Sequence, residues 1–148
     1  MSYKEKQSLV SLVTTIIVSI PYLAYIFMRY QSGNYAAGEE VSFWAKAILV
    51  LIPLRIVMEI IISIIFSILS AIITRENTTD ITDERDNLIE LKGMRNSFLV
   101  FIIGFLVALI SVALNNSVST MFIIIFITGV VSELSDIFSK LYYYHKGV

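Results

Sequence analysis

Residues 43–73 read FWAKAILVLIPLRIVMEIIISIIFSILSAII, an apolar run in which Lys46, Arg55 and Glu59 are the charged residues. A helix needs about 20 predominantly apolar residues to cross the ~30 Å hydrocarbon core of a bilayer. The run is longer than that, and it lacks the alternation of polar and apolar positions that a barrel strand requires. It therefore predicts a membrane-spanning helix whose excess length is taken up by tilt, by projection from the membrane or by a kink at Pro53.

Three further stretches have the same character, at residues 8–28, 97–114 and 121–143. Hydrophobic residues make up 57% of the chain, which exceeds the ~45–50% of a typical soluble domain. The predicted fold class is therefore all-α. Residues 1–148 form a single domain, a polytopic bundle of four transmembrane helices.

The distribution of lysine and arginine predicts the orientation of the four spans, because cytoplasmic loops carry an excess of both. The connections at residues 31–41 and 115–120 contain neither, whereas the connection at residues 75–95 and both ends of the chain are basic. We therefore expect both termini and the 75–95 loop to face the cytoplasm, in a multi-pass protein of the cytoplasmic (inner) membrane. The basic residues concerned are Lys4, Lys6, Arg75, Arg85, Lys92, Arg95, Lys140 and Lys146.

The overall composition excludes several classes of site. A net charge of −1 without a basic patch argues against nucleic acid as a direct partner, since phosphate binding needs concentrated lysine and arginine. There is no cysteine and one histidine, His145, so thiolate and histidine-rich metal sites are excluded. No serine stands beside a base in a nucleophile motif. We therefore predict no catalytic residue, no cofactor and no metal; an enzyme acting on lipid is the least supported alternative.

Four ionisable residues lie inside the apolar runs, where a charge costs roughly 2.5–3.5 kcal/mol on insertion scales. Arg55 and Glu59 are one helical turn apart in the second span, and Glu133 and Asp136 are spaced similarly in the fourth. Polar residues continue both faces. We predict that the second and fourth spans pack together along them, with Arg55 bridging the carboxylates. The polar residues are Ser63, Ser67, Ser70 and Thr74 in the second span, and Thr128, Ser132, Ser135 and Ser139 in the fourth.

This intramembrane charge network of Arg55, Glu59, Glu133 and Asp136 has two principal interpretations. It is either a structural ion-pair network that fixes helix register, which is the simpler interpretation, or the proton or cation site of a carrier. Three carboxylates against one arginine leave an excess of negative charge, which favours protonation of at least one acid. Binding of a hard cation such as magnesium or calcium is a third alternative.

The third span carries small residues along one side, namely Gly104, Ala108, Ser111 and Asn115. Small residues let a neighbouring helix approach closely. We expect this face to pack inside the bundle, with the seam of a homo-oligomer as the alternative.

Residues 82–95 read TDERDNLIELKGMR and form the most densely charged segment of the chain. Thr82 is a candidate N-cap, followed by acidic residues in the first turn, where the helix dipole favours them. The pattern predicts a short cytoplasmic helix that leads into the third span, acidic on one face and basic on the other. Three interpretations of this helix are open. It is an ordinary solvated helix anchored at the membrane surface by its basic residues, a docking surface for a cytoplasmic partner, or a helix that binds a metal ion on its acidic face. The docking candidates are Asp83, Glu84, Arg85, Asp86, Glu90, Lys92 and Arg95.

The same segment carries a resemblance to a known family, through a motif of the form ITDERDxLIELKxxRNS over residues 81–97. Supporting similarity lies at residues 1–6, 42–48 and 141–148. The chain resembles a family of uncharacterised four-helix integral membrane proteins of bacteria and archaea. In the family pattern arginine tends to stand where this chain has His145.

The resemblance implies no established activity. Genes of the family often lie beside a small helix-turn-helix transcription regulator, which implies a membrane partner that senses or sequesters such a regulator. We therefore expect a non-enzymatic regulatory or accessory protein that engages a cytoplasmic partner through residues 82–95. The alternative is an oligomeric proton- or cation-coupled carrier that uses the intramembrane carboxylates.

Overall fold

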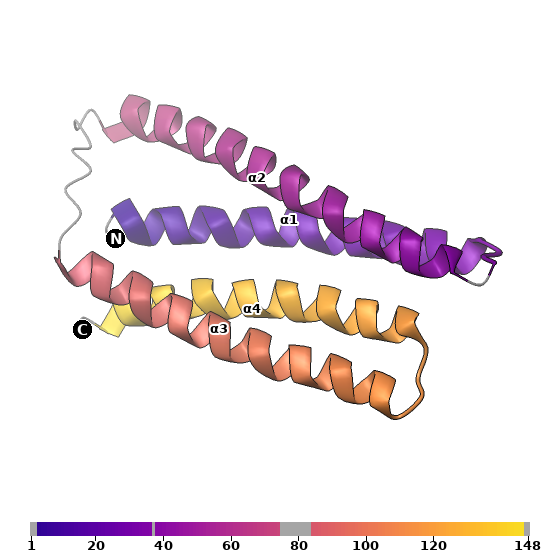
Figure 1. The fold of residues 1–148 in the computed structure, drawn as a ribbon. Helices are drawn as coiled ribbons and strands as arrows, with labels where there is room; N and C mark the ends of the chain where they lie inside the picture. The colour runs from indigo at the N-terminus through magenta and orange to yellow at the C-terminus, as the bar shows by residue number, and fades with distance from the viewer. Residues whose placement is uncertain (1–2, 37, 75–83, 147–148) are drawn as a thin grey trace.

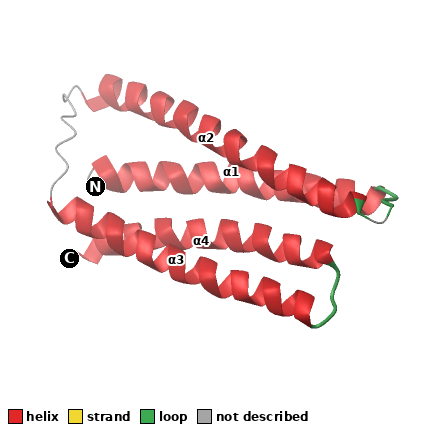
Figure 2. Ribbon diagram, in the orientation of Figure 1, coloured by secondary structure: helices red, strands yellow, loops and turns green. Residues whose placement is uncertain are grey.

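A computed structural model describes residues 3–36, 38–74 and 84–146, apart from the side chains of Tyr3, Ser70, Ile73 and Thr74. In these ranges the chain forms four helices and no strand (Figures 1 and 2). All four helices are long and apolar enough to cross a membrane. The predicted all-α, four-helix fold of a multi-pass membrane protein is therefore confirmed. The helices are α1 (Tyr3–Ser32), α2 (Glu39–Thr74), α3 (Glu84–Ala113) and α4 (Val118–Lys146).

The helices run alternately up and down, so their ends gather at two ends of the bundle (Figure 1). The starts of α1 and α3 and the ends of α2 and α4 lie together at what we name the terminal end. The connections at residues 33–38 and 114–117 lie at the opposite end, which we name the hairpin end. An even number of passes places both chain termini on one side of a membrane, as the predicted orientation requires. That this side is the cytoplasm stays a prediction.

The helices extend beyond the predicted spans, most clearly in α3. The predicted third span begins at residue 97, whereas α3 begins at Glu84 and continues for 30 residues. The predicted short cytoplasmic helix and the third span are thus one helix, about 45 Å long at ~1.5 Å per residue. The candidate N-cap Thr82 and the neighbouring Asp83 lie outside the described residues.

The tight connection between α3 and α4 is set by two asparagines and a serine. Asn115 has a left-handed conformation (φ 63°), which asparagine tolerates better than most residues. Its backbone N–H donates to the Val112 carbonyl oxygen at 2.9 Å, and the backbone N–H of Asn116 donates to the Ser111 carbonyl oxygen at 3.1 Å. These are the paired hydrogen bonds of a Schellman cap. Ser117 then caps the start of α4 through its hydroxyl. Asn115 therefore lies in the turn and does not pack between helices, so its predicted place on the small-residue face is wrong.

The rest of the small-residue face packs inside the bundle, as predicted, because it lies against α4. A Cβ atom at Gly104 would overlap the side chain of Thr128, and Ala108 is fully buried. The Ser97 and Ser132 hydroxyls lie 2.9 Å apart across the same contact. This contact, which we name the α3–α4 seam, is the most extensive helix pairing in the bundle.

Aromatic residues hold α1 and α2 together at the hairpin end. Trp44 of α2 is completely buried and packs with Ile26 of α1. The Tyr22 hydroxyl of α1 donates to a backbone carbonyl oxygen of α2 at 2.7 Å. The Ser119 hydroxyl of α4 donates to the Glu40 carboxylate of α2 at 2.6 Å. These contacts join three helices at this end.

Toward the terminal end α2 lies apart from α1 (Figure 1). The Ser67 hydroxyl of α2 donates there to the backbone of Ser63 in its own helix, and the side chains of Ser70 and Thr74, predicted to continue this face, lie outside the described residues. The serines of α4 contact α3 instead, where Asn96 donates to Ser139 at 3.0 Å. The prediction that the second and fourth spans pack along a shared polar stripe is therefore wrong away from the charges, since the small residues of α3 let it occupy that face of α4.

Candidate functional site

Arg55 of α2 and Glu133 of α4 form a two-pronged ion pair, in which both terminal nitrogens of the guanidinium contact the carboxylate. This bidentate geometry adds directional specificity to the attraction between the charges. Nη2 also donates to the Thr15 hydroxyl at 3.2 Å, and Nη1 donates to the Ser19 hydroxyl at 3.3 Å. Both hydroxyls belong to α1, so one arginine joins three helices at one level.

The α1 side of this site is a face of hydroxyl residues that sequence reasoning missed. Thr15 is fully buried. Its hydroxyl accepts from Arg55 and lies 2.9 Å from both a Glu133 oxygen and the Ser11 carbonyl oxygen, either of which can take its single proton. The signal for such a face is a helical spacing of hydroxyls inside an apolar run. The residues with this spacing are Ser8, Ser11, Thr15 and Ser19.

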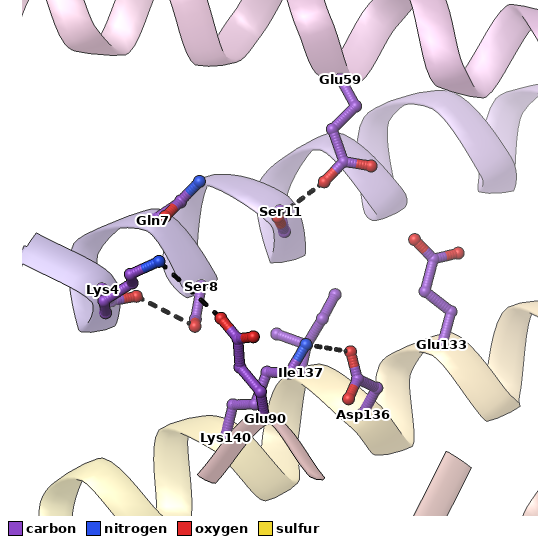
Figure 3. Close-up of a pocket in the computed structure, with 10 residues that line it drawn as sticks. All are labelled: Lys4, Gln7, Ser8, Ser11, Glu59, Glu90, Glu133, Asp136, Ile137 and Lys140. Carbon is purple, nitrogen blue, oxygen red and sulfur yellow. Dashed lines mark hydrogen bonds and ion pairs between the residues drawn. The ribbon is translucent and has the colours of Figure 1, made fainter. Parts of the chain in front are cut away.

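Glu59 faces the same region from α2 but is not held by the arginine. Its Oε1 accepts a hydrogen bond from the Ser11 hydroxyl at 2.9 Å, and within the described residues it forms no ion pair. Figure 3 shows its carboxylate pointing toward that of Glu133 on the facing helix. Arg55, one turn away on α2, is near enough for the two charges to interact. The contacts of Arg55 are with Glu133, however, so the predicted bridge does not reach Glu59.

Asp136 is separate from the arginine, which corrects the prediction of one network of four charges. It pairs with Lys140, one turn further along α4, at 2.6 Å. Its Oδ1 atom is buried without a hydrogen-bond partner, and it lies where a Cβ atom on Gly93 of α3 would crowd it. Asp136 turns toward α3 and the terminal end, where Lys140 and not Arg55 is within reach.

A polar cavity of about 320 Å³ lies among these side chains on the terminal side (Figure 3). Water occupies ~30 Å³ per molecule, so there is room for roughly ten molecules. Ser11, Glu59 and Glu133 form its deep wall, and residues near the start of α1 and the end of α4 form its outer wall. The deep carboxylates thus border a polar space that is large enough for water. The full lining is Lys4, Gln7, Ser8, Ser11, Glu59, Glu90, Glu133, Asp136, Ile137 and Lys140.

A second space, the lateral groove, lies beside the same charges between α2 and the α3–α4 pair. Its volume is about 530 Å³ and its walls are mostly apolar. Arg55, Glu59 and Glu133 line its inner wall. Glu59 and Glu133 therefore border both the polar cavity and the lateral groove. The apolar lining includes Ile48, Leu51, Ile52 and Ile56 of α2, Phe101 of α3, and Phe126 and Gly129 of α4.

Several charges predicted to dock a partner contact the protein itself. Arg85 donates to the backbone oxygen of Tyr144 at 3.4 Å, and the Tyr144 hydroxyl hydrogen-bonds the Asp86 carboxylate. The Lys92 ammonium lies over the ring of Tyr143, 4.9 Å from the ring centroid. The first turns of α3 are thus fastened to the last turn of α4.

The remaining docking candidates are spread over different sides of α3. Glu90 faces the start of α1, where its carboxylate lies 3.8 Å from the Lys4 ammonium. Glu84 and Arg95 are exposed, and Asp83 lies outside the described residues. The structure therefore does not gather the charges of this segment on one outward surface.

The outward side of the same segment also carries apolar residues. Leu88, Leu91 and Met94 are 57–64% exposed and recur every three residues, so they share one broad face of α3, which the exposed Glu84 and Arg95 border. A helix face of this mixed kind suits the boundary between lipid and water or a partner surface that is largely apolar.

The fold and the site together define a class of protein. It is a four-helix multi-pass membrane protein with an arginine–carboxylate pair among its helices and a polar cavity beside that pair. Over the residues that the structure describes, no group of three or more histidine, cysteine, aspartate or glutamate side chains is placed to hold a metal ion. No family model, curated protein or solved structure matches the chain. Its resemblance to the uncharacterised four-helix family stays a prediction.

Proposed function

We propose that the protein is a small proton- or cation-coupled carrier of the cytoplasmic membrane, with its terminal end in the cytoplasm. One observation carries the proposal: Glu59, a carboxylate that hydrogen-bonds Ser11 but pairs with no described cation, borders both the polar cavity and the lateral groove. Carriers and relays place ionisable residues within their membrane spans, facing cavities that water reaches.

The charge balance at the site supports exchange at Glu59. Arg55 contributes one positive charge, and Glu59 and Glu133 contribute two negative charges when both are ionised, so the three residues together are negative. Arg55 is engaged with Glu133, which leaves Glu59 as the acid where a proton or a cation relieves the excess. That relief is large in surroundings of low dielectric constant, because an unbalanced charge is costly there.

The packing of α2 supports the need for a partner copy. At the hairpin end the Glu40–Ser119 hydrogen bond and the buried Trp44 hold α2 against its neighbours. These contacts close the hairpin end of a single copy. A cation could be released there only if α2 moved, or if the pathway ran along α2 with a second copy forming its other wall. Four helices also make a thin wall around a pathway. We therefore propose that the carrier works as a homo-oligomer.

Cation-driven proton movement in liposomes tests the proposal. The purified full chain is reconstituted, sodium, potassium and tetraphenylphosphonium salts are added outside in turn, and internal pH is followed with a trapped dye and corrected for the change seen in protein-free liposomes. We expect at least one salt to drive proton efflux and Glu59→Gln to abolish it, because the amide keeps the shape and loses the exchangeable charge. Glu5→Gln, the same chemical change outside the cavity lining, is the matched control and keeps the wild-type rate. The carrier proposal fails if no salt moves protons, or if Glu59→Gln moves them as wild type does.

A second candidate function, a non-enzymatic regulatory or accessory protein, is favoured by the exposed apolar face of Leu88, Leu91 and Met94. A cytoplasmic partner such as a small helix-turn-helix regulator would contact this face together with the exposed Arg95 beside it. The charges that α1 and α4 contact would then serve to hold the segment in place.

Crosslinking in the native host tests this second function. Leu91→Glu should abolish capture of the partner, because it places a charge in the apolar contact. Leu114→Glu is the matched control, since Leu114 is 70% exposed at the hairpin end, and it should leave capture unchanged. Absence of any captured partner, or equal capture by both variants, counts against the regulator.

A further inference from the structure

The lateral groove and Glu59 indicate which kind of substrate the protein carries; this inference rests on the carrier function proposed above. We propose that the coupled species is a lipophilic organic monocation that reaches Glu59 from the lipid through the lateral groove. A proton reaches the same carboxylate through the polar cavity. No covalent bond changes, because proton and organic cation compete for one negative charge.

The dimensions of the two spaces support this division. The lateral groove, at about 530 Å³, falls within the ~300–1,000 Å³ typical of small-molecule sites. Its walls are mostly apolar and include Ile52 and Ile56 of α2 and Phe101 of α3, and such walls suit hydrocarbon or aryl groups. The polar cavity, at about 320 Å³, is at the lower limit of the same range, and its lining rather than its size distinguishes it, because it consists largely of lysines, carboxylates and hydroxyls. It suits water and protons.

The charge of the inner wall selects the sign of the ligand. Arg55 lines the groove, but its guanidinium is already shared between Glu133 and two hydroxyls of α1. Glu59 accepts from the Ser11 hydroxyl and has no cationic partner among the described residues. An anion in the groove would meet excess negative charge in apolar surroundings, whereas a single positive charge neutralises it.

The depth of Glu59 argues against a phospholipid as the occupant. Glu59 lies near the middle of α2, and the groove runs from it toward the hairpin end, where Ile48 lines it. The head group of a phospholipid stays at the membrane surface and would not reach this level. A cation whose charge is covered by hydrocarbon groups enters an apolar space at a smaller loss of hydration than a bare ion does.

Gly129 supports a space kept for a ligand. It lines the groove, and a Cβ atom there would meet nothing within 4 Å. Gly104 is the opposite case, because a Cβ atom there would overlap Thr128, so helix packing explains that glycine. Packing against the described residues does not explain Gly129. A larger side chain at this position would fill the groove without displacing a helix.

Binding of radiolabelled tetraphenylphosphonium to the purified full chain tests the inference. Binding is measured by scintillation proximity in detergent, with tetraphenylborate as an anion of the same shape. We expect measurable tetraphenylphosphonium binding, because the excess charge on the inner wall of the lateral groove is negative. Glu59→Gln should weaken it at least about tenfold, as loss of a buried charge partner does. Glu5→Gln, outside both linings, should bind as wild type does.

Gly129→Leu separates the groove from the charge. It keeps Glu59 and fills the apolar space, so it should also weaken binding at least about tenfold if the groove holds the ligand. Size-exclusion profiles and helical circular dichroism confirm that each variant is folded; a variant that fails this check is replaced by Glu59→Ala, which also removes the charge, or by Gly129→Val.

Three results would overturn the inference. The first is proton efflux that inorganic cations drive through Glu59 while tetraphenylphosphonium does not bind, which leaves the carrier intact and removes the organic substrate. The second is equal binding of tetraphenylborate, which makes the groove an unselective apolar slot. The third is tetraphenylphosphonium binding that Glu59→Gln and Gly129→Leu leave unchanged. Absence of both binding and efflux overturns the carrier as well.

Discussion

The α3–α4 seam and the α1–α2 pair are both antiparallel helical hairpins, yet they pack differently. In the seam, glycines and hydroxyl residues recur along the contact, from Gly93 to Ala108, and the helices stay close. In the α1–α2 pair, aromatic residues hold the hairpin end and the helices then separate (Figure 1). Close packing in lipid requires small residues along the whole face. Where α2 offers large aliphatic and charged side chains instead, cavities form, and the candidate site lies among them.

The largest effect is expected at the charge that joins these two halves. Arg55→Met leaves the partly buried Glu133 without its counter-ion, which should lower stability by about 3 kcal/mol, the lower end of the range for breaking a buried pair. Unfolding in mixed micelles, followed by circular dichroism, measures the loss. The double variant Arg55→Met/Glu133→Gln removes both charges and should recover most of it. An Arg55→Met protein as stable as wild type would mean that the pair does not hold the halves together.

A smaller effect is expected within the seam. Gly104→Ala places a methyl group against Thr128, and such overpacking typically costs about 1–3 kcal/mol. Gly129→Ala is the matched change at a helical glycine with open space around it, and it should raise stability by about 0.5–1 kcal/mol, because alanine favours the helix over glycine. Equal losses at the two glycines would erase the distinction between a close contact and an open groove.

At the hairpin end, Ser119→Ala removes the hydroxyl that donates to Glu40. The expected loss is about 1 kcal/mol, because a hydrogen bond to a carboxylate is lost but Glu40 remains partly accessible to water. Ser42→Ala, at an exposed serine of the same helix end as Glu40, serves as the comparison. If Ser119→Ala and Ser42→Ala have the same melting temperature, the hydrogen bond between Ser119 and Glu40 does not stabilise the contact of α2 with α4.

The smallest effect is expected at the ion pair of Lys4 and Glu90. The Lys4 ammonium lies 3.8 Å from the Glu90 carboxylate, and the two side chains are 19% and 48% exposed. Glu90→Gln should cost about 0.5 kcal/mol or less, because the carboxylate at this end of the pair is half exposed to water. The difference from wild type should vanish in ~1 M salt, where screening acts within about 3 Å. A loss as large as that of Arg55→Met and independent of salt would show that the Lys4–Glu90 ion pair stabilises the fold.

The number and approximate position of the helices could be predicted from the sequence, because length and apolarity alone decide whether a segment can span a bilayer. The neighbour of each helix could not. Lipid and a neighbouring helix are equally apolar, so a hydrophobic run does not reveal which face meets protein. Gly104 and Ala108 were predicted to pack internally, but their partner helix was visible only in the structure.

For the candidate site, the ionisable residues could be found from sequence and their pairing could not. Arg55, Glu59, Glu133 and Asp136 stand out because charges are rare in apolar runs. The separation of Asp136 from Arg55 depends on how α4 rotates against α3, which a linear pattern does not encode. The hydroxyl face of α1 was detectable by its spacing, but serine and threonine are common in membrane spans and carry no sign of the partner they face.

The length of α2 gives the bilayer itself a part in the chemistry. At 36 residues the helix is about 54 Å long at ~1.5 Å per residue, against a hydrocarbon core of ~30 Å. Its fixed points are the hairpin end and the Arg55–Glu133 pair, so the part of α2 beyond that pair is the segment whose slope we expect to follow membrane thickness, while α3 and α4 brace each other. Glu59 lies one turn beyond the pair and would move relative to Glu133 as this slope changes. The wild-type protein should therefore bind tetraphenylphosphonium with different affinities in vesicles of short-chain and of long-chain lipids. Identical affinity in both would show that the slope of α2 is fixed.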